Sequence, residues 1–270
     1  MTVHFIGAGP GAADLLTLRA VRLLETSPVC VYAGTYLDEA VLSHCPPGAT
    51  LVDSQHLDLD QITAHLVAAH EAGHDVARLC SGDPSLYSAL AEQTRRLDAA
   101  GVPWDVTPGV PAYAAAAAIV GRELTVPEVA QSVVLTRAQA ASTAMPDTEA
   151  LSAFAATRAT LVLHLAVRRT RELAESLVDA YGADCPVVVV GNASQPTETV
   201  LQGTLADIGA QVEAANLRQA AVIMVGRALA ARTFPESHLY DSHRPRHGAE
   251  RDERGDQEPE PRPDSATSGR

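Results

Sequence analysis

Four short loops rich in glycine and proline carry the residue types that could hold a ligand. Each follows a predicted strand, and they are Gly7-Ala8-Gly9-Pro10-Gly11, Ala33-Gly34-Thr35-Tyr36, Ser81-Gly82-Asp83-Pro84 and Pro108-Gly109-Val110-Pro111. Ligands of open parallel sheets bind beyond the carboxyl ends of the strands, where loops lead into helix N-termini with free N–H groups. Glycine and proline also mark ordinary turns, so each loop alone is a weak signal. Together the four loops predict a ligand site along one edge of a sheet.

The first of these loops approximates the dinucleotide fingerprint G-x-G-x-x-G/A through Gly7, Gly9 and Ala12. That interpretation requires an acidic residue after the second strand to hold the ribose, and the chain has Ala33-Gly34-Thr35 there. Pro10 also removes an N–H group that would serve a pyrophosphate. We therefore do not expect a nicotinamide cofactor.

A second motif, His70-Glu71-Ala72-Gly73-His74, matches the zinc signature H-E-x-x-H. Such a site needs both histidines on one face of an uninterrupted helix. Gly73 is expected to end the helix, and Asp75-Val76 begins the next predicted strand. We therefore expect no metal site, and a zinc hydrolase is an alternative that rests on this match alone.

Asp83 is the acidic residue at the predicted ligand edge. Its carboxylate is expected either to cap a helix that starts near Ser85 or to face a ligand, and the sequence leaves both roles open. No Ser/His/Asp set and no pair of carboxylates stands out, so the catalytic residue stays unknown.

Composition excludes several classes of function. The chain has 270 residues, of which 46% are hydrophobic, so it can bury the core of one large or two ordinary domains. A formal charge of −13 argues against nucleic acid as a partner. All 20 basic residues are arginine, which excludes a Walker lysine, a kinase lysine and a Schiff base to pyridoxal phosphate. We find no leader peptide or membrane-spanning run, and therefore expect a cytoplasmic protein without a membrane partner. The four scattered cysteines are expected to be structural free thiols.

Residues 1–120 alternate predicted strands with predicted helices, which indicates a mainly parallel sheet covered by helices. Thr17 and Asp60 are the expected helix N-caps, and Gly73 and Gly101 the expected helix ends. The strands are expected at 3–6, 29–32, 50–53, 76–80 and 104–107, and the helices near 17–26, 60–72, 86–100 and 112–120.

The pattern restarts after a predicted hinge at 121–131 and indicates a second α/β domain over 132–240. Its sheet is expected to be mixed, because only a short helix separates the last two strands. Residues 241–270 have the composition of a disordered tail. Strands are expected at 133–137, 160–165, 186–190, 199–203 and 221–226, and helices over 169–181, ending at Gly182, and from Leu205.

The loops, taken in order, resemble the tetrapyrrole (corrin/porphyrin) methylase family. The resemblance runs from Val3 to about Tyr240 and rests on GAGPGAADLLTLRA at 7–20, CSGDPSLYSAL at 80–90, TPGVPAYAAAAA at 107–118 and PVVVVGNASQPTETVLQGTL at 186–205. It implies two α/β domains, each with a mainly parallel or mixed sheet flanked by helices, and an active site in the cleft between them. It also implies S-adenosylmethionine as methyl donor and a homodimer.

Within that family, other segments resemble the branch that methylates precorrin-4, or cobalt-precorrin-4, at C11 in cobalamin biosynthesis. These segments are VYAGTYL at 31–37, LTVPEVAQSVVLTR at 124–137, Met145-Pro146, NASQP at 192–196 and SHLYD at 237–241. Two alternatives stay open: methylation at another ring carbon of a precorrin or of uroporphyrinogen III, and a non-catalytic tetrapyrrole-binding protein.

Carried over by position, the resemblance implies cofactor contacts from small residues of both domains. These contacts are Gly9, Pro10, Gly11, Ser81, Gly82, Asp83, Leu86, Pro111, Ala112, Leu165 and Ala193. The tetrapyrrole substrate is a polycarboxylate, which arginine can bind through bidentate pairs. Candidate substrate contacts are therefore Tyr36, Arg122, Arg137 and Arg168.

Overall fold

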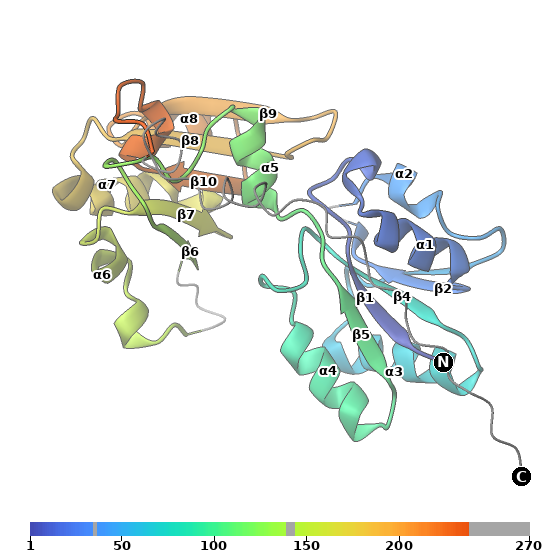
Figure 1. The fold of residues 1–270 in the computed structure, drawn as a ribbon. Helices are drawn as coiled ribbons and strands as arrows, with labels where there is room; N and C mark the ends of the chain where they lie inside the picture. Colours follow the sequence, from blue (N-terminus) through green and yellow to red (C-terminus); the bar gives the residue numbers. More distant parts are fainter. Residues whose placement is uncertain (35–36, 139–143, 238–270) are drawn as a thin grey trace, which may run out of the picture. The chain divides into compact units, whose positions relative to one another are not determined.

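The computed structural model describes residues 1–34, 37–138 and 144–237, and Met1–Phe234 form one unit that holds two five-stranded sheets (Figure 1). The predicted tail at 241–270 and the boundary at residue 240 lie outside the described residues. Each sheet is flanked by helices, so the predicted α/β class with two sheets is confirmed.

The first sheet has the strand order β3-β2-β4-β1-β5, and every neighbouring pair is parallel. Its central strand β4 is buried at all five positions, as expected for a strand covered on both faces. Its elements are β1 (Val3–Gly7), α1 (Leu18–Thr26), β2 (Val29–Tyr32), α2 (Glu39–Leu42), β3 (Thr50–Asp53), α3 (Leu59–Glu71), β4 (Val76–Cys80), α4 (Leu90–Ala99) and β5 (Trp104–Thr107), with a 3-10 turn η1 (Ala13–Leu15).

The second sheet has the order β6-β7-β10-β8-β9, in which only β6 and β7 are parallel, so the prediction of a mixed sheet is confirmed. Its elements are β6 (Val133–Arg137), α6 (Leu151–Ala155), β7 (Thr160–His164), α7 (Thr170–Tyr181), β8 (Pro186–Gly191), β9 (Thr199–Thr204), α8 (Ile208–Ala214) and β10 (Ala221–Val225), with 3-10 turns η3 (Asp147–Glu149), η4 (Val167–Arg169) and η5 (Arg227–Ala230).

Helix α5 (Ala112–Ile119) packs on the second sheet. Its buried Ala115 and Ala116 share a core cluster with Val162, Val188 and Met224 of that sheet. The sequence pattern predicts that this helix belongs to the domain expected over residues 1–120. Its alanine-rich surface has no polar face to orient it, which is why the pattern alone did not show which sheet it covers.

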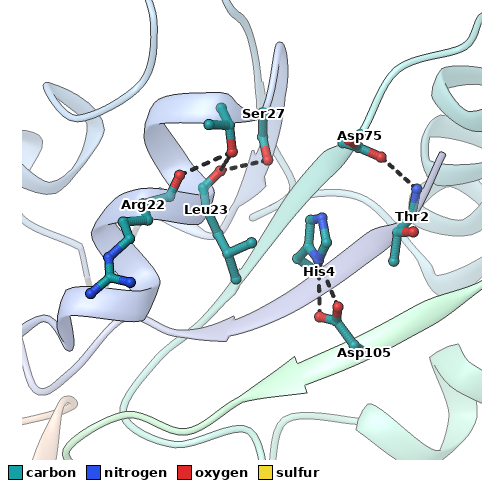
Figure 2. Close-up of polar contacts among 8 residues, drawn as sticks. Thr2, His4, Arg22, Leu23, Ser27, Asp75 and Asp105 are labelled. Atoms are coloured by element: carbon teal, nitrogen blue, oxygen red, sulfur yellow. Dashed lines mark hydrogen bonds and ion pairs between the residues drawn. The ribbon is translucent and has the colours of Figure 1, made fainter. Parts of the chain in front are cut away.

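The N-terminal ends of the first-sheet strands are tied by side chains, on the edge opposite the predicted ligand loops. Figure 2 shows Thr2 N–H donating to Asp75 Oδ1 at 2.7 Å and His4 Nδ1 lying 2.9 Å from Asp105 Oδ1. At the end of α1, Ser27 Oγ donates to the carbonyl of Leu23 at 2.7 Å. The contacts of Thr2 and His4 fix β1 between β4 and β5 and leave its carboxyl end free for the loops.

The expected helix ends are confirmed at several positions. Thr17 caps α1 by accepting from Ala20 N–H, and Gly73 and Gly101 follow α3 and α4 with left-handed backbone, φ +79° and +69°. Gly182 is the C-cap of α7.

Three expected helix starts are wrong. Asp60 is not the cap of α3: Asp58 is, in a capping box with Gln61. The helix expected from residue 86 begins only at Leu90, because Tyr87 and Ala89 are left-handed, each with φ +54°. The helix expected from Leu205 likewise begins later, at Ile208.

The capping box gives a test of this correction. Asp58→Ala removes the acceptor of the Gln61 N–H bond, so we expect a loss of about 1 kcal/mol in the free energy of unfolding, measured by urea denaturation. Asp60→Ala is the matched control, since this exposed carboxylate only pairs with Arg96, and we expect a change within about 0.5 kcal/mol. A larger loss for Asp60→Ala than for Asp58→Ala would contradict the assignment.

Candidate active site

Three of the four predicted ligand loops meet at the carboxyl edge of the first sheet. Ala8 N–H donates to the carbonyl of Cys80 at 2.8 Å, and Gly9 and Gly82 exchange backbone hydrogen bonds of 3.1 and 2.8 Å. The loop after β1 and the loop after β4 are therefore paired along their backbones. The loop after β2 bonds elsewhere, from Gly34 N–H to Asp53 Oδ1 at 3.0 Å, and Tyr36 lies outside the described residues.

Glycine is required where these loops touch the loop after β5. A Cβ on Gly7 would lie 2.4 Å from Gly109 N, and a Cβ on Gly109 would lie 2.3 Å from the carbonyl of Gly82. Main chain therefore packs directly on main chain, which no larger residue permits. The edge that results presents backbone rather than long side chains.

Asp83 joins the loops after β4 and β5. Its Oδ1 accepts from Ser85 N–H at 2.8 Å and from the Ser85 hydroxyl, and its Oδ2 accepts from Gly109 N–H at 2.9 Å. Partial burial acts to raise the pKa of this carboxyl, but the bonds from Ser85 and Gly109 outweigh it, so the pKa lies below its usual value. The expected helix cap is wrong, since α4 begins at Leu90, and the carboxylate instead closes a turn and holds a neighbouring loop.

A buried arginine supports the turn that follows Asp83. Arg78 Nε donates to Gln93 Oε1 at 2.9 Å, and Gln93 Nε2 in turn donates to the carbonyls of Ser88 and Ala89 at 3.1 and 3.2 Å. Burial lowers the pKa of Arg78, yet a guanidinium keeps its proton. Within the described residues, the groups that accept from Arg78 are all uncharged, with Ser54 Oγ at 3.2 Å among them. The network fixes the turn at residues 87–89, in which Tyr87 and Ala89 have left-handed backbone.

The second sheet contributes a turn that touches the first loop. Ala12 N–H donates to Ser194 Oγ at 3.1 Å, and a Cβ on Gly11 would lie 2.5 Å from Gln195 Cγ and 3.1 Å from the carbonyl of Ala193. The structure therefore brings together Gly11 and Ala193, two predicted cofactor contacts that are 182 positions apart.

His164, at the end of β7, was not predicted as a site residue. Its ring centroid lies 5.6 Å from that of Tyr87 and 6.5 Å from that of Tyr113, and burial lowers its pKa. The next residue, Leu165, is 71% exposed and left-handed at φ +53°, so the expected strand end at residue 165 is one position too late. Tyr87 and Tyr113 lie in the loop motifs of the sequence, but no local pattern connects them with His164.

The predicted cofactor residues differ in exposure. Gly9, Pro10, Gly11, Gly82 and Ala193 are buried, Asp83, Leu86, Pro111 and Ala112 are half-buried, and Ser81 and Leu165 are exposed.

The three predicted substrate arginines lie in different places. Arg137 is the register partner of His164 and bonds the carbonyls of Ala138 and Ala144 at 3.5 and 3.3 Å. Arg122 is half-buried in the segment after α5. Arg168 donates to the carbonyl of Arg218 at 3.0 Å and lines a cavity of about 250 Å³ beside α7 and α8. Of the three arginines, Arg137 is the one placed beside His164, as its partner on the neighbouring strand.

The H-E-x-x-H motif is interrupted as expected. Helix α3 ends at Glu71, and His70 Nδ1 lies 2.6 Å from the carbonyl of Met1. Within residues 1–34, 37–138 and 144–237, no three His, Cys, Asp or Glu side chains gather in a way that could hold a metal ion.

Among the helices that the structure describes, none has the length and apolar character needed to span a membrane.

The chain is similar to known proteins along most of its length. Residues 2–209 match the family model described as tetrapyrrole (corrin/porphyrin) methylases. The precorrin-4 C(11)-methyltransferase of Rhodococcus erythropolis is 56% identical over 246 residues, which cover 91% of this chain and 99% of that protein.

Solved structures agree with the match. A cobalt-precorrin-4 methyltransferase superposes with a TM-score of 0.81 at 32% identity, covering 84% of this chain and 95% of that one. Uroporphyrin-III C-methyltransferase from Thermus thermophilus, complexed with S-adenosylhomocysteine, superposes with a TM-score of 0.72 at 28% identity, covering 85% of this chain and 99% of that one. On the family model and on these relatives, the chain belongs to the tetrapyrrole (corrin/porphyrin) methylase family.

Proposed function

We propose that this protein is an S-adenosylmethionine-dependent C-methyltransferase that methylates precorrin-4 at C11 in cobalamin biosynthesis. The observation that carries the proposal is the 56% identity to a precorrin-4 C(11)-methyltransferase across 99% of that relative. The uroporphyrin-III C-methyltransferase structure is 28% identical, which favours the precorrin substrate over uroporphyrinogen III. The cobalt-containing and cobalt-free substrates share the same reacting carbon, and the proposal is made for the cobalt-free form that the curated relative is named for.

The cofactor is proposed to bind where the glycine loops and the two sheets touch. The contacts of Gly11 with Ala193 and Gln195, and of Gly82 with Gly9, support this position. The proposed contacts are those expected from the sequence: Gly9, Pro10, Gly11, Ser81, Gly82, Asp83, Leu86, Pro111, Ala112, Leu165 and Ala193. Close backbone approach suits a ligand held mainly by main-chain groups.

Substrate carboxylates are proposed to pair with arginine. Arg137 is favoured over Arg122 and Arg168 because it is the register partner of His164. Tyr36 is kept as a proposed substrate contact.

The methyl transfer requires few chemical groups from the side chains of the protein. Bound S-adenosylmethionine supplies a methyl group already activated by its sulfonium, and an electron-rich pyrrolic carbon forms the new bond as the C–S bond breaks and a ring N–H proton is released. The residues of the chain orient the two reactants and exclude water, an effect worth up to about 7–11 kcal/mol. The network from Arg78 through Gln93 to Ser88 and Ala89 serves this purpose by fixing the loop after Asp83.

Three organisational features belong to the proposal. The two sheets are proposed to act as two domains with the cofactor at their junction. Because α5 packs on the second sheet, we assign it to the second domain, which moves the domain boundary from the expected residue 120 to a position before Ala112. The family resemblance supports a homodimer. The biosynthetic role supports a cytoplasmic location.

The function is tested by incubating the protein with precorrin-4 and methyl-¹³C S-adenosylmethionine. We expect a product heavier by one methyl, with the label at C11 in the ¹³C spectrum. Uroporphyrinogen III serves as the competing substrate. No transfer to precorrin-4, under conditions where the Rhodococcus erythropolis relative transfers its methyl, would contradict the proposal, and so would a label at another carbon.

Asp83 gives a second test through its two occupied oxygens. In Asp83→Asn one oxygen becomes an NH₂ group, so either Gly109 N–H or Ser85 loses its acceptor. We therefore expect the free energy of unfolding to fall by about 1–3 kcal/mol. We also expect S-adenosylhomocysteine to bind more weakly. Asp53→Asn is the matched control, because a single Oδ1 accepts from both Gly34 and Gln55 and an amide oxygen can replace it.

The pH dependence of stability follows from the lowered pKa of Asp83. Its contribution is fully present above the unfolded pKa of about 3.9 and is lost as the pH falls through the lower folded pKa. Urea melts between pH 6 and 2.5 should therefore show a smaller acid-side loss for Asp83→Asn than for the wild type. Identical acid profiles would show that the carboxylate does not hold the two loops.

A further inference from the structure

One side-chain nitrogen in the described part of the chain is buried without a partner, and it is Nε2 of His164. Buried polar atoms in proteins are nearly always hydrogen-bonded, so an exception at the end of a strand requires an explanation. His164 ends β7, next to the left-handed Leu165, which is the point where the second sheet meets the proposed cofactor contacts.

Two aromatic rings pack against the imidazole that carries this nitrogen. His164 contacts Tyr87 at a tilt of 48° and Tyr113 edge-on at 90°. Each ring belongs to a residue that directly neighbours a proposed cofactor contact: Tyr87 follows Leu86, Tyr113 follows Ala112, and His164 precedes Leu165. The imidazole with the unpartnered nitrogen thus lies where three of the segments proposed to hold the cofactor meet.

The imidazole of His164 is neutral near pH 7. Burial disfavours the imidazolium and lowers its pKa below 6.5. The groups facing the ring are the Tyr87 and Tyr113 rings and, across the strand pair, Arg137, while Glu149 acts on Tyr87. In the neutral ring, the tautomer with its proton on Nδ1 leaves Nε2 as an acceptor and avoids burying an unpaired N–H.

We infer that His164 is a positioning residue for the methyl donor, whose Nε2 accepts a hydrogen bond from an N–H or O–H group that S-adenosylmethionine shares with S-adenosylhomocysteine. The inference rests on the proposed function for the location of the cofactor. The proposal requires the 47% exposed Tyr87 side chain, whose ring centroid lies 5.6 Å from that of His164, to change position when the donor binds, while its backbone stays fixed. His164 contributes a bond without charge, so it does not repel the cofactor's sulfonium.

The test uses three variants that separate the two ring nitrogens. His164→Phe keeps a ring against Tyr87 and Tyr113 and removes both nitrogens. His164→Gln places an amide oxygen near the position of Nε2, whereas His164→Asn places one near Nδ1. His65→Phe, an exposed change on α3, is the control for replacing a histidine.

S-adenosylhomocysteine is titrated calorimetrically into each full-length variant without tetrapyrrole. We expect the Kd of His164→Phe and His164→Asn to rise roughly 5- to 30-fold, the loss of one hydrogen bond, while His164→Gln recovers much of the affinity and His65→Phe keeps it. In the wild type, affinity should fall as the pH drops through the lowered pKa of His164, because a protonated Nε2 can no longer accept. His164→Gln should lack this acid limb.

Three results would overturn the inference. The first is wild-type affinity and an unchanged pH profile in His164→Phe, as expected if a buried water satisfies Nε2. The second is equal loss in His164→Gln and His164→Asn, which also decides the matter if His164→Phe fails to fold. The third is an unchanged Kd with a raised KM for the tetrapyrrole, which would place the nitrogen against the substrate. Failure of the proposed function is distinct, since it appears as absent methyl transfer by the wild type whatever the Kd.

Discussion

The backbones of three loops lie in direct contact at Gly7, Gly82 and Gly109, and the rest of the site depends on this approach. A Cβ at Gly7 or Gly109 would come within 2.4 Å of a neighbouring backbone atom, so no side chain can separate the loops. Main-chain groups are therefore brought to the carboxyl edge of the sheet, at the position where an open parallel sheet binds its ligands. Asp83 secures the arrangement by bonding Ser85 and Gly109 from its two oxygens.

A second constraint maintains the loop after Asp83 at the cost of burying a charge. Arg78 is 7% exposed, and in the part of the chain that the structure describes its guanidinium donates to uncharged acceptors, so its desolvation is offset by several hydrogen bonds to neutral groups rather than by an ion pair. The benefit is structural: Gln93, held by Arg78, fixes the carbonyls of Ser88 and Ala89 and thereby the left-handed Tyr87 between them and Leu86. Strained backbone of this kind is kept where the surrounding structure over-determines it, and it gathers at functional sites.

Local sequence patterns predicted the strands and the loops well, for a physical reason. Runs such as Val76–Cys80 and Val29–Tyr32 are rich in β-branched or buried residues and are bounded by glycine or proline, so their limits are set by adjacent residues. The start of α4 was missed because the left-handed residues before it are held by Gln93 and Arg78, a contact across the fold. Asp58 was missed because Asp60 looks equally suitable until the reciprocal bond with Gln61 is seen. His164 could not be predicted as a site residue from the sequence, because its ring contacts are with Tyr87 and Tyr113, which lie in other segments of the chain.

We propose that the cofactor binds on the backbone edge formed by the glycine loops and on the second-sheet residues that touch it. Amide hydrogen exchange with and without S-adenosylhomocysteine tests this most directly. We expect added protection confined to 7–12, 81–89, 108–113, 163–166 and 192–195, which includes segments from both sheets. Protection limited to the arginine-lined cavity beside α7 and α8, with the glycine loops unchanged, would contradict it.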